Sequence, residues 1–156
     1  MALAVVEYFV ESAAVPHWKN QSESLVWAGF LVVVLGEALR KGAILTARAS
    51  FTHAIQMERR PQHQLVTHGV YSICRHPGYL GWMLWCVGTQ VLLRNPACTL
   101  IFLVWSWKFF AERIPHEEKI LLEMFGRRYR DYAEKTRLWI PLIPSPVLLD
   151  PRARIV

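Results

Sequence analysis

The sequence lacks the patterns by which cysteine-rich, zinc-binding and nucleic-acid-binding proteins are usually recognised. It holds three cysteines in 156 residues, no two of them in a Cys-x-x-Cys pair, so neither a disulfide framework nor a zinc site is indicated. Its formal charge is +6, but no basic patch interleaved with aromatic residues forms a nucleic-acid-binding module. His63, His68 and His76 have none of the i, i+3 or i+4 relations of a familiar metal site. We therefore expect neither a metal nor nucleic acid as a partner.

Features of a cleaved leader and of several domains are also missing. The first residues, MALAVVEYFVESAAV, have no basic stretch before their apolar run and carry Glu7 and Glu11 within it, which argues against a cleaved signal peptide. No internal repeat or low-complexity segment interrupts the chain. The length suits a single domain that spans residues 1–156.

Hydrophobic residues dominate what is present. They make up 53% of the chain against 19% charged residues, and the seven tryptophans sit mainly beside the longest apolar runs, a composition typical of membrane proteins. Residues 25–46, 79–93 and 96–111 are the candidate membrane helices. Only Arg94-Asn95 separates the last two, so we expect a tight helical hairpin. The predicted fold is an all-α, polytopic integral membrane protein with this helical hairpin toward its C-terminus.

Basic residues predict how the hairpin is oriented. They are frequent before the hairpin and after it, whereas the turn itself has Arg94 alone. By the positive-inside tendency, the polar segments 47–78 and 112–143 lie in the cytosol and the turn lies on the lumenal side. Contact with anionic lipid headgroups accounts for the positive charge, so the lipid bilayer is the partner predicted at this level.

The residues after the hairpin predict an amphipathic helix and a proline-rich tail. Residues 116–135 gather apolar side chains on one side, Gly126 is expected to interrupt or bend this helix, and Pro115 suggests a break or a kink before it. The segment LWIPLIPSPVLLDP is too rich in proline to continue as helix. We expect its apolar residues to dip into the membrane interface as a short anchor: Leu138, Trp139, Ile140, Leu142 and Ile143.

A polar stretch, HQLVTHGVYSICRHPGYLG at residues 63–81, adjoins the start of the hairpin. Arg75 offers a donor fork suited to a carboxylate, and Tyr71 and Tyr79 offer ring faces for a purine or a cation. His63 and His76 offer hydrogen bonds or proton handling. Two interpretations are open: an interfacial turn whose histidines bond to backbone carbonyls, or a site that binds a polar ligand at a membrane surface.

A second polar cluster, ERIPHEEK at residues 112–119, follows the hairpin. Arg113 and Glu117 are four residues apart, so on one helix they would be neighbours, and such a pair usually marks a solvated, salt-bridged face. Both clusters lie at the same end of one hairpin and must therefore lie close together. This favours a pocket at the membrane interface with cation- and carboxylate-binding groups. The residues alone do not name a reaction.

Three motifs resemble those of a known enzyme family. They are LVT-x-G-x-Y at residues 65–71, RHP-x-Y-x-G at 75–81 and EE-xx-L-xxx-FG-xx-Y-xx-Y at 117–132. Over roughly residues 30–143 the chain closely resembles the protein-S-isoprenylcysteine O-methyltransferases, the isoprenylcysteine carboxyl methyltransferase family. The resemblance implies a multi-pass enzyme of the endoplasmic reticulum membrane whose active site faces the cytosol. Such an enzyme transfers the methyl group of S-adenosylmethionine to the C-terminal prenylcysteine carboxylate of CaaX proteins, forming a methyl ester and S-adenosylhomocysteine.

The same resemblance implies roles for individual residues. Three are candidate catalytic residues: Arg113 faces and binds the prenylcysteine carboxylate, Glu117 holds the amino group or sulfonium of the cofactor, and Arg75 supports the site. The candidate cofactor-binding residues are Gln56, the run His63, Gln64, Leu65 and Val66, then Tyr71, the run His76, Pro77, Gly78 and Tyr79, and Glu117.

The sequence departs from the family pattern in three ways. Family members are usually longer, with additional membrane helices at the N-terminus; Gly78 replaces a more usual small polar residue; and Pro115-His116 stands where an acidic run is common. Two other functions therefore stay open. One is methylation of another membrane substrate, such as a phospholipid amine, and the other is a truncated, non-catalytic membrane protein that associates with a full-length partner.

Overall fold

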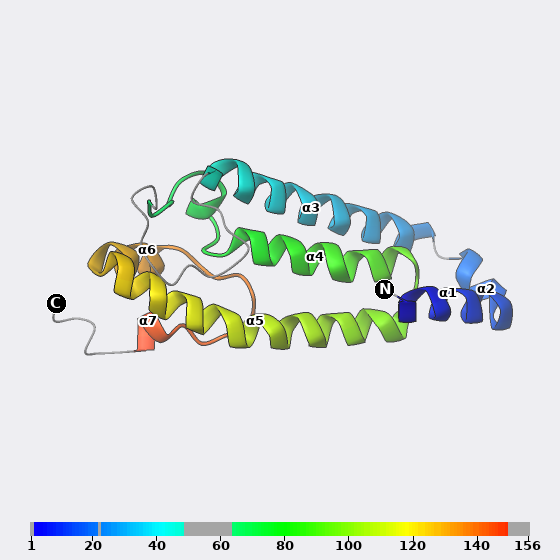
Figure 1. The fold of residues 1–156 in the computed structure, drawn as a ribbon. Helices are drawn as coiled ribbons and strands as arrows, with labels where there is room; N and C mark the ends of the chain where they lie inside the picture. The colour runs from blue at the N-terminus through cyan, green and yellow to red at the C-terminus, as the bar shows by residue number, and fades with distance from the viewer. Residues whose placement is uncertain (1, 22, 49–63, 150–156) are drawn as a thin grey trace. The chain divides into compact units, whose positions relative to one another are not determined.

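The computed structural model describes residues 2–21, 23–48 and 64–149, and within these ranges the chain is built of helices and the segments that connect them (Figure 1). The helices are α1 (Ala2–Ala14), α2 (Pro16–Gln21), α3 (Glu23–Ala47), the 3-10 helix η2 (Gly69–Ser72), α4 (Pro77–Leu92), α5 (Pro96–Phe125), α6 (Arg127–Lys135) and α7 (Pro146–Leu149). The described residues form no β-strand beyond an isolated bridge between Cys74 and Arg137. The all-α prediction is therefore confirmed.

The predicted helices agree with the observed ones, with one exception. Helix α3 contains residues 25–46, and α4 covers nearly all of 79–93. Helix α5 begins at Pro96 but continues through Pro115, so of the break or kink expected at this proline the break is wrong. A proline removes one helical hydrogen bond, and the fully buried side chains of Ile114 and Glu118 hold the turn around it in place. None of the described helices combines the length and the apolar character that a membrane crossing needs.

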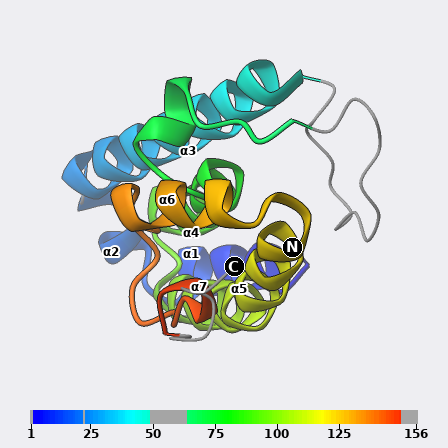
Figure 2. The same cartoon turned by 90° about the vertical axis from the view of Figure 1, so that its left-hand side faces the viewer.

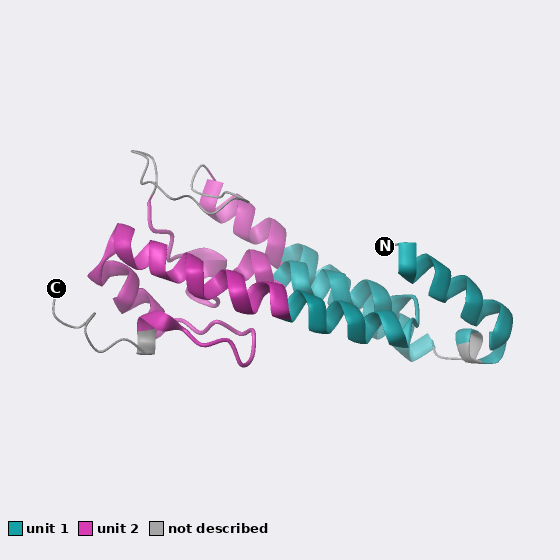
Figure 3. Ribbon diagram, turned by 60° about the horizontal axis from the view of Figure 1, so that its bottom comes forward, with its two compact units in different colours: residues 1–38, 81–107 teal, residues 39–80, 108–156 magenta. Residues whose placement is uncertain are grey.

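The chain divides into two compact units, which are described separately. The first consists of residues 1–38 and 81–107, and the second of residues 39–80 and 108–156 (Figure 3). In the first unit, α3 and α4 approach each other so closely that there is no room for a side chain at Gly36. A Cβ atom there would lie 2.6 Å from the backbone nitrogen of Trp85 and 2.7 Å from the carbonyl oxygen of Gly81.

The turn between α4 and α5 is held by a lysine from α2. The side chain of Lys19 is only 4% exposed, and its Nζ lies 2.7 Å from the Glu11 carboxylate. The same Nζ donates to the carbonyl oxygens of Leu93 and Arg94 at 3.1 and 2.8 Å and to Asn95 Oδ1 at 2.8 Å. Three acceptors at a helix end that would otherwise need water are thus satisfied by one buried cation.

The start of α5 is capped by a carboxylate from α1. Glu7 accepts hydrogen bonds from the backbone N–H groups of Ala97 and Cys98, each at 2.8 Å. A negative charge at a helix N-terminus satisfies free N–H groups and interacts favourably with the helix dipole. Glu7 and Glu11, which in the sequence argue only against a signal peptide, therefore both hold the hairpin turn.

In the second unit, Gly126 ends α5 in a left-handed conformation with a φ of +55°. The predicted interruption at this glycine is confirmed. Helix α6 follows and contacts α7, and both helices are labelled in Figure 2. Its buried residues Tyr129, Tyr132 and Ala133 pack with Val147 of α7. The residues that pack around this cluster come from the polar stretch and from α5: Leu65, Tyr71, Leu121, Leu122 and Phe125.

The tail after α6 differs from the expected membrane anchor. Leu138 and Ile140 are 7% and 3% exposed, so these two side chains are buried in the protein and the prediction that they enter the interface is wrong. Trp139 and Leu142 point outward with 57% and 88% exposure, and both adopt a positive φ. An apolar pattern alone does not distinguish burial in the protein from contact with lipid, because both remove the side chain from water.

Candidate active site

The phenol oxygen of Tyr79 joins two charged residues of the second unit. Tyr79 lies in the first turn of α4, and its hydroxyl donates to Glu117 Oε2 at 2.5 Å. The same oxygen accepts a hydrogen bond from Arg113 Nε at 2.8 Å. Arg113 and Glu117 stand one turn apart on α5, so both can reach a single atom on the facing helix. The predicted neighbours Arg113 and Glu117 are thus linked through a third predicted residue.

Two aromatic rings stack on the ring of Tyr79. The ring of His76 lies parallel to that of Tyr79, with centroids 5.4 Å apart, and Phe110 stacks on Tyr79 at 4.9 Å. The guanidinium carbon of Arg113 is 5.4 Å from the centroid of the Tyr79 ring and 5.8 Å from that of Phe109. A cation over an aromatic face is attracted by the ring quadrupole, so the stack also fixes the position of Arg113.

A buried ion pair lies next to the His76 ring. Arg75 Nη1 is 2.9 Å from Glu118 Oε1, and the side chains of the two residues are 4% and 0% exposed. His76 connects this pair to Glu117, because its Nε2 lies 3.5 Å from Glu118 Oε1 and its Nδ1 lies 4.0 Å from Glu117 Oε1. Arg75, predicted as a support of the site, is therefore linked to Glu117 through Glu118 and His76.

A serine from the tail completes the buried pair. Arg75 Nη1 donates to Ser145 Oγ at 3.0 Å, and the Ser145 hydroxyl donates to Glu118 Oε2 at 2.5 Å. Burial alone would raise the pKa of Glu118, but the nearby His76 ring, the hydrogen bond from Ser145 and the charge of Arg75 outweigh it and lower the pKa below its usual value. Glu118 is therefore a charged carboxylate inside the protein at neutral pH.

The polar stretch is shaped by a glycine and a proline. Gly69 has a φ of +59°, and a Cβ atom there would lie 3.0 Å from the Thr46 side chain, so a larger residue would meet both strain and crowding. Pro77 is buried at the first position of α4, where its missing N–H breaks no helical hydrogen bond. These two positions direct the backbone so that His76 and Tyr79 face α5.

The structure brings some predicted cofactor residues to this site and leaves others apart from it. Tyr71 is half-buried; burial and then the charge of Glu117 raise the pKa of its phenol to about 12. Leu65 packs against the tyrosine cluster of α6, and Val66 and Gly78 are half-buried. Gln64 is exposed. Gln56 and His63 lie outside the described residues, so their predicted roles stay predictions.

Sequence reasoning missed Glu118 and Ser145. The EE pair in the third motif contains both glutamates, but consecutive helix residues point about 100° apart, and only the folded helix shows which one faces inward. Ser145 is separated from Arg75 by 70 positions along the chain and carries no motif of its own. Among the residues that the structure describes, no group of histidine, cysteine and carboxylate side chains is arranged to hold a metal ion.

Comparison with known proteins decides the family. The model of the isoprenylcysteine carboxyl methyltransferase family matches residues 27–123, more than half of the chain. The chain belongs to this family. The resemblance carried by the three motifs is confirmed, and all the charged and aromatic side chains grouped around Tyr79 lie within the matched residues.

Relatives in this isoprenylcysteine carboxyl methyltransferase family come from plants and animals. The "Probable protein-S-isoprenylcysteine O-methyltransferase" of Oryza sativa subsp. indica is 44% identical over 143 residues, which cover 92% of this chain and 74% of the rice protein. "Protein-S-isoprenylcysteine O-methyltransferase B" of Arabidopsis thaliana is 46% identical and covers 92% of this chain and 72% of its own length. The Xenopus laevis "Protein-S-isoprenylcysteine O-methyltransferase" is also 46% identical, over 94% of this chain and 50% of the frog protein.

A solved structure shares the fold. It is described as the eukaryotic intramembrane Ras methyltransferase ICMT, without a monobody, and it matches with a TM-score of 0.89 at 45% identity. The match covers 92% of this chain and 51% of that one. The family member described here thus spans about three quarters of its plant relatives and about half of the frog protein and of the solved chain.

Proposed function

We propose that this chain transfers the methyl group of S-adenosylmethionine to the C-terminal prenylcysteine carboxylate of CaaX proteins. The observation that supports this most directly is the shared bonding of Arg113 and Glu117 to the phenol oxygen of Tyr79. One cation and one carboxylate are thereby held side by side. This is the pair of charges needed to bring an anionic acceptor to a cationic methyl donor.

The residues present fit the cofactor. Glu117 keeps 23% of its side chain exposed, whereas the Glu118 side chain is fully buried, so only the first carboxylate can reach a ligand. The half-buried ring of Tyr79 lies beside it, with the buried ring of His76 stacked on it. A carboxylate suits the amino group or sulfonium of S-adenosylmethionine, and the exposed part of the Tyr79 ring suits its purine. When bound, S-adenosylmethionine supplies an electrophilic methyl group on a positively charged sulfur.

Arg113 orients the acceptor carboxylate. A guanidinium matches the geometry of a carboxylate with two parallel N–H groups, and the bond from Nε to Tyr79 limits the rotation of this guanidinium. A carboxylate is ionised at neutral pH, so its attack needs no general base. Most of the rate therefore comes from holding the two reacting atoms in line at the right distance, for which Arg113, Tyr79 and Glu117 form a fixed frame.

We further propose that the chain works in the bilayer of the endoplasmic reticulum as a multi-pass protein, with this site facing the cytosol. Large apolar side chains are exposed on the first unit, including Trp27 and Leu31 of α3 and Val104 and Trp105 of α5. Water is a poor environment for so many large apolar groups, whereas lipid chains suit them. A bilayer would also deliver the isoprenyl chain of the substrate, at about 0.8 kcal/mol for each buried methylene.

The test uses the purified chain in lipid nanodiscs. It should bind S-adenosylhomocysteine and transfer a labelled methyl group from S-adenosylmethionine to N-acetyl-farnesylcysteine. Binding without transfer would contradict the catalytic proposal and favour a non-catalytic membrane protein. Transfer to phosphatidylethanolamine in place of the prenylcysteine would favour the phospholipid amine.

Charge reversal at Arg113 distinguishes the substrates. Arg113→Glu should abolish transfer to N-acetyl-farnesylcysteine and leave S-adenosylhomocysteine binding in place, because only a carboxylate acceptor requires the cation. Arg128→Glu is the matched control, since Arg128 is an exposed arginine of the same unit. If Arg113→Glu keeps its prenylcysteine activity, Arg113 does not bind the acceptor carboxylate.

A further inference from the structure

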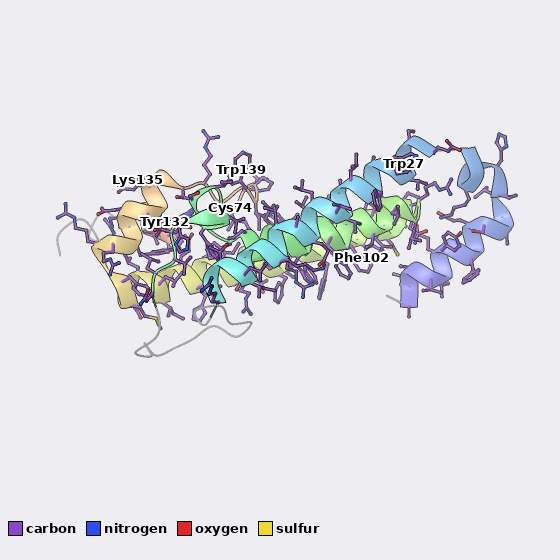
Figure 4. The ribbon with its side chains drawn as sticks, turned by 90° about the horizontal axis from the view of Figure 1, so that it is seen from above. Trp27, Cys74, Phe102, Tyr132, Lys135 and Trp139 are labelled. Atoms are coloured by element: carbon purple, nitrogen blue, oxygen red, sulfur yellow. The ribbon has the colours of Figure 1, made fainter. Side chains whose placement is uncertain are left out.

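The tail that follows α6 is bonded to the loop that precedes α4. The backbone N–H of Arg75 donates to the Arg137 carbonyl at 3.1 Å, and the Cys74 thiol donates to the Leu138 carbonyl at 3.1 Å. The indole N–H of Trp139 donates to the Ile73 carbonyl at 2.8 Å, and Cys74 and Trp139 are labelled at this place in Figure 4. We call residues 136–147 the tail strap. It holds the backbone of the loop that carries Arg75 and His76.

One side chain of the tail strap reaches the buried ion pair. Ser145 is 8% exposed and occupies both roles of its hydroxyl, as acceptor for Arg75 and as donor to Glu118. If the Ser145 side chain only filled space, its hydroxyl would need at most one hydrogen-bond partner. Here it lies between the two members of a buried ion pair, and removing it would leave Glu118 Oε2 without its donor.

The Arg75–Glu118 pair influences the position of Glu117 and Tyr79. Glu118 adjoins Glu117 on α5, so fixing the side chain of one limits the rotation of the helix that presents the other. Glu118 also lies 3.5 Å from Nε2 of His76, whose ring is within 1° of parallel to that of Tyr79. Two routes therefore lead from Ser145 to Tyr79 and Glu117, one through His76 and one through the helix backbone.

We propose that Ser145 is a positioning residue for the cofactor side of the site: it couples the tail strap to the Arg75–Glu118 pair and thereby sets the places of His76, Tyr79 and Glu117. This rests on the proposed methyl transfer and deepens it. Ser145 itself touches none of the reacting atoms. Its loss is expected to weaken cofactor binding and to leave the binding of the prenylcysteine nearly unchanged, because Arg113 also lies over the ring of Phe109, a contact within α5 that does not pass through Tyr79.

The experiment compares Ser145→Ala, Ser145→Thr and Ser106→Ala with the unmodified chain in nanodiscs. Ser106 is the matched control, since it is a fully buried serine of the first unit whose hydroxyl bonds a helix carbonyl. Ser145→Ala should raise the Kd for S-adenosylhomocysteine and the KM for S-adenosylmethionine about tenfold, as expected for one charge-assisted hydrogen bond. The KM for N-acetyl-farnesylcysteine should change less than twofold. Ser145→Thr keeps the hydroxyl and should restore cofactor binding.

The pH dependence of cofactor binding is a readout that a loss of folding alone would not change. The charged and titratable groups around Glu118 are Arg75 and His76 of the loop, Glu117 beside it, and Tyr129 and Tyr132 of α6. The Ser145 hydroxyl stabilises the ionised form of Glu118, so Ser145→Ala should raise its pKa. As the pH is lowered, Ser145→Ala should therefore lose cofactor binding at a higher pH than the unmodified chain does. Ser106→Ala should leave the pH profile of cofactor binding unchanged.

The outcomes separate this inference from the proposed function. If the unmodified chain turns over and Ser145→Ala binds cofactor within twofold of it, the inference is wrong and the function stands. If Ser145→Ala and Ser106→Ala weaken binding equally, Ser145 is only structural, which also overturns the inference. If the unmodified chain binds S-adenosylhomocysteine without turnover, the proposed function fails, and the ratio of the two Kd values still decides the role of Ser145.

Discussion

At the scale of the residue, Glu117 and Glu118 show how two identical neighbours take different tasks. Glu117 keeps part of its side chain exposed and bonds to Tyr79, whereas Glu118 is fully buried and bonds to Ser145 and Arg75. The motif led the sequence reasoning to Glu117 but not to Glu118. Which glutamate faces inward depends on the rotation of α5. Packing sets that rotation, and the identity of the two residues does not.

Tyr79→Phe tests whether the shared oxygen matters to the reaction. The change removes the atom that joins Arg113 and Glu117 and keeps the ring that stacks on His76 and Phe110. We expect kcat/KM for N-acetyl-farnesylcysteine to fall about 10- to 100-fold, since a hydrogen bond to a charged group contributes about 1.5–3 kcal/mol. Steady-state methyl transfer in nanodiscs measures this.

Tyr8→Phe is the control for Tyr79→Phe. Tyr8 is a half-buried tyrosine of α1 in the first unit, so its hydroxyl can be removed without touching the site. Its kinetics should equal those of the unmodified chain. Unchanged kinetics in Tyr79→Phe would show that Arg113 and Glu117 keep their places without the phenol oxygen.

At the scale of the element, the helices were largely predictable and the tail was only partly so. Long apolar runs separated by Arg94-Asn95 predicted α4 and α5, and Gly126 predicted the end of α5. The break expected at Pro115 does not occur, because the helix around it is held by packing. The tail was correctly expected not to continue α6 as helix, although it contains the short α7. Its bonds to the loop at residues 73–75 join positions far apart in the sequence, which no local pattern records.

Gly36→Ala tests the close approach of α3 and α4. The added Cβ would meet backbone atoms of Trp85 and Gly81, which cannot turn aside as a flexible side chain can. We expect destabilisation by about 1–3 kcal/mol, the usual cost of overpacking, seen as a lower Tm in a lipid-mimetic detergent.

Gly42→Ala provides the comparison on the same helix. Its Cβ would lie 3.1 Å from a methyl group of the Val70 side chain, which can shift slightly. Because alanine favours the helix over glycine by up to about 1 kcal/mol, this variant should be neutral or slightly more stable. Equal losses of Tm in both variants would mean that the contact at Gly36 is not special.

At the scale of the whole molecule, the sequence predicted the helical class, the hairpin and the meeting of the two polar clusters, here within the second unit. It did not predict how the N-terminal helices are used. Glu7 lies 91 positions from Cys98, and Lys19 lies 76 positions from Asn95, so neither pairing could be inferred from spacing. In the sequence Glu7 and Glu11 argued only against a signal peptide, whereas in the fold Glu7 caps α5 and Glu11 pairs with the lysine that holds the hairpin turn.

Lys19→Met tests this use of α2. The change keeps a long apolar chain but leaves Glu11 without its cation and three acceptors of the hairpin turn without their donor. We expect a loss of about 2–3 kcal/mol, less than for a fully buried pair because 22% of the Glu11 side chain stays exposed. Chemical denaturation followed by tryptophan fluorescence measures the loss.

Lys108→Met is the control for Lys19→Met, because Lys108 is an exposed lysine of α5. Its stability should change by less than about 0.5 kcal/mol, as for most surface substitutions. If Lys19→Met is as stable as this control, the lysine does not hold the hairpin turn.

The bonding of Arg113 and Glu117 to one phenol has a consequence for inhibitor design. With its two charges compensating each other, the site is electrically balanced before any ligand arrives. A compound that carries only a carboxylate or only a cation would engage one partner and leave the other charge without a counter-charge. A single molecule that presents a carboxylate and a cation at the spacing of the two side chains would keep the balance, and selective ligands for this site should therefore be zwitterionic.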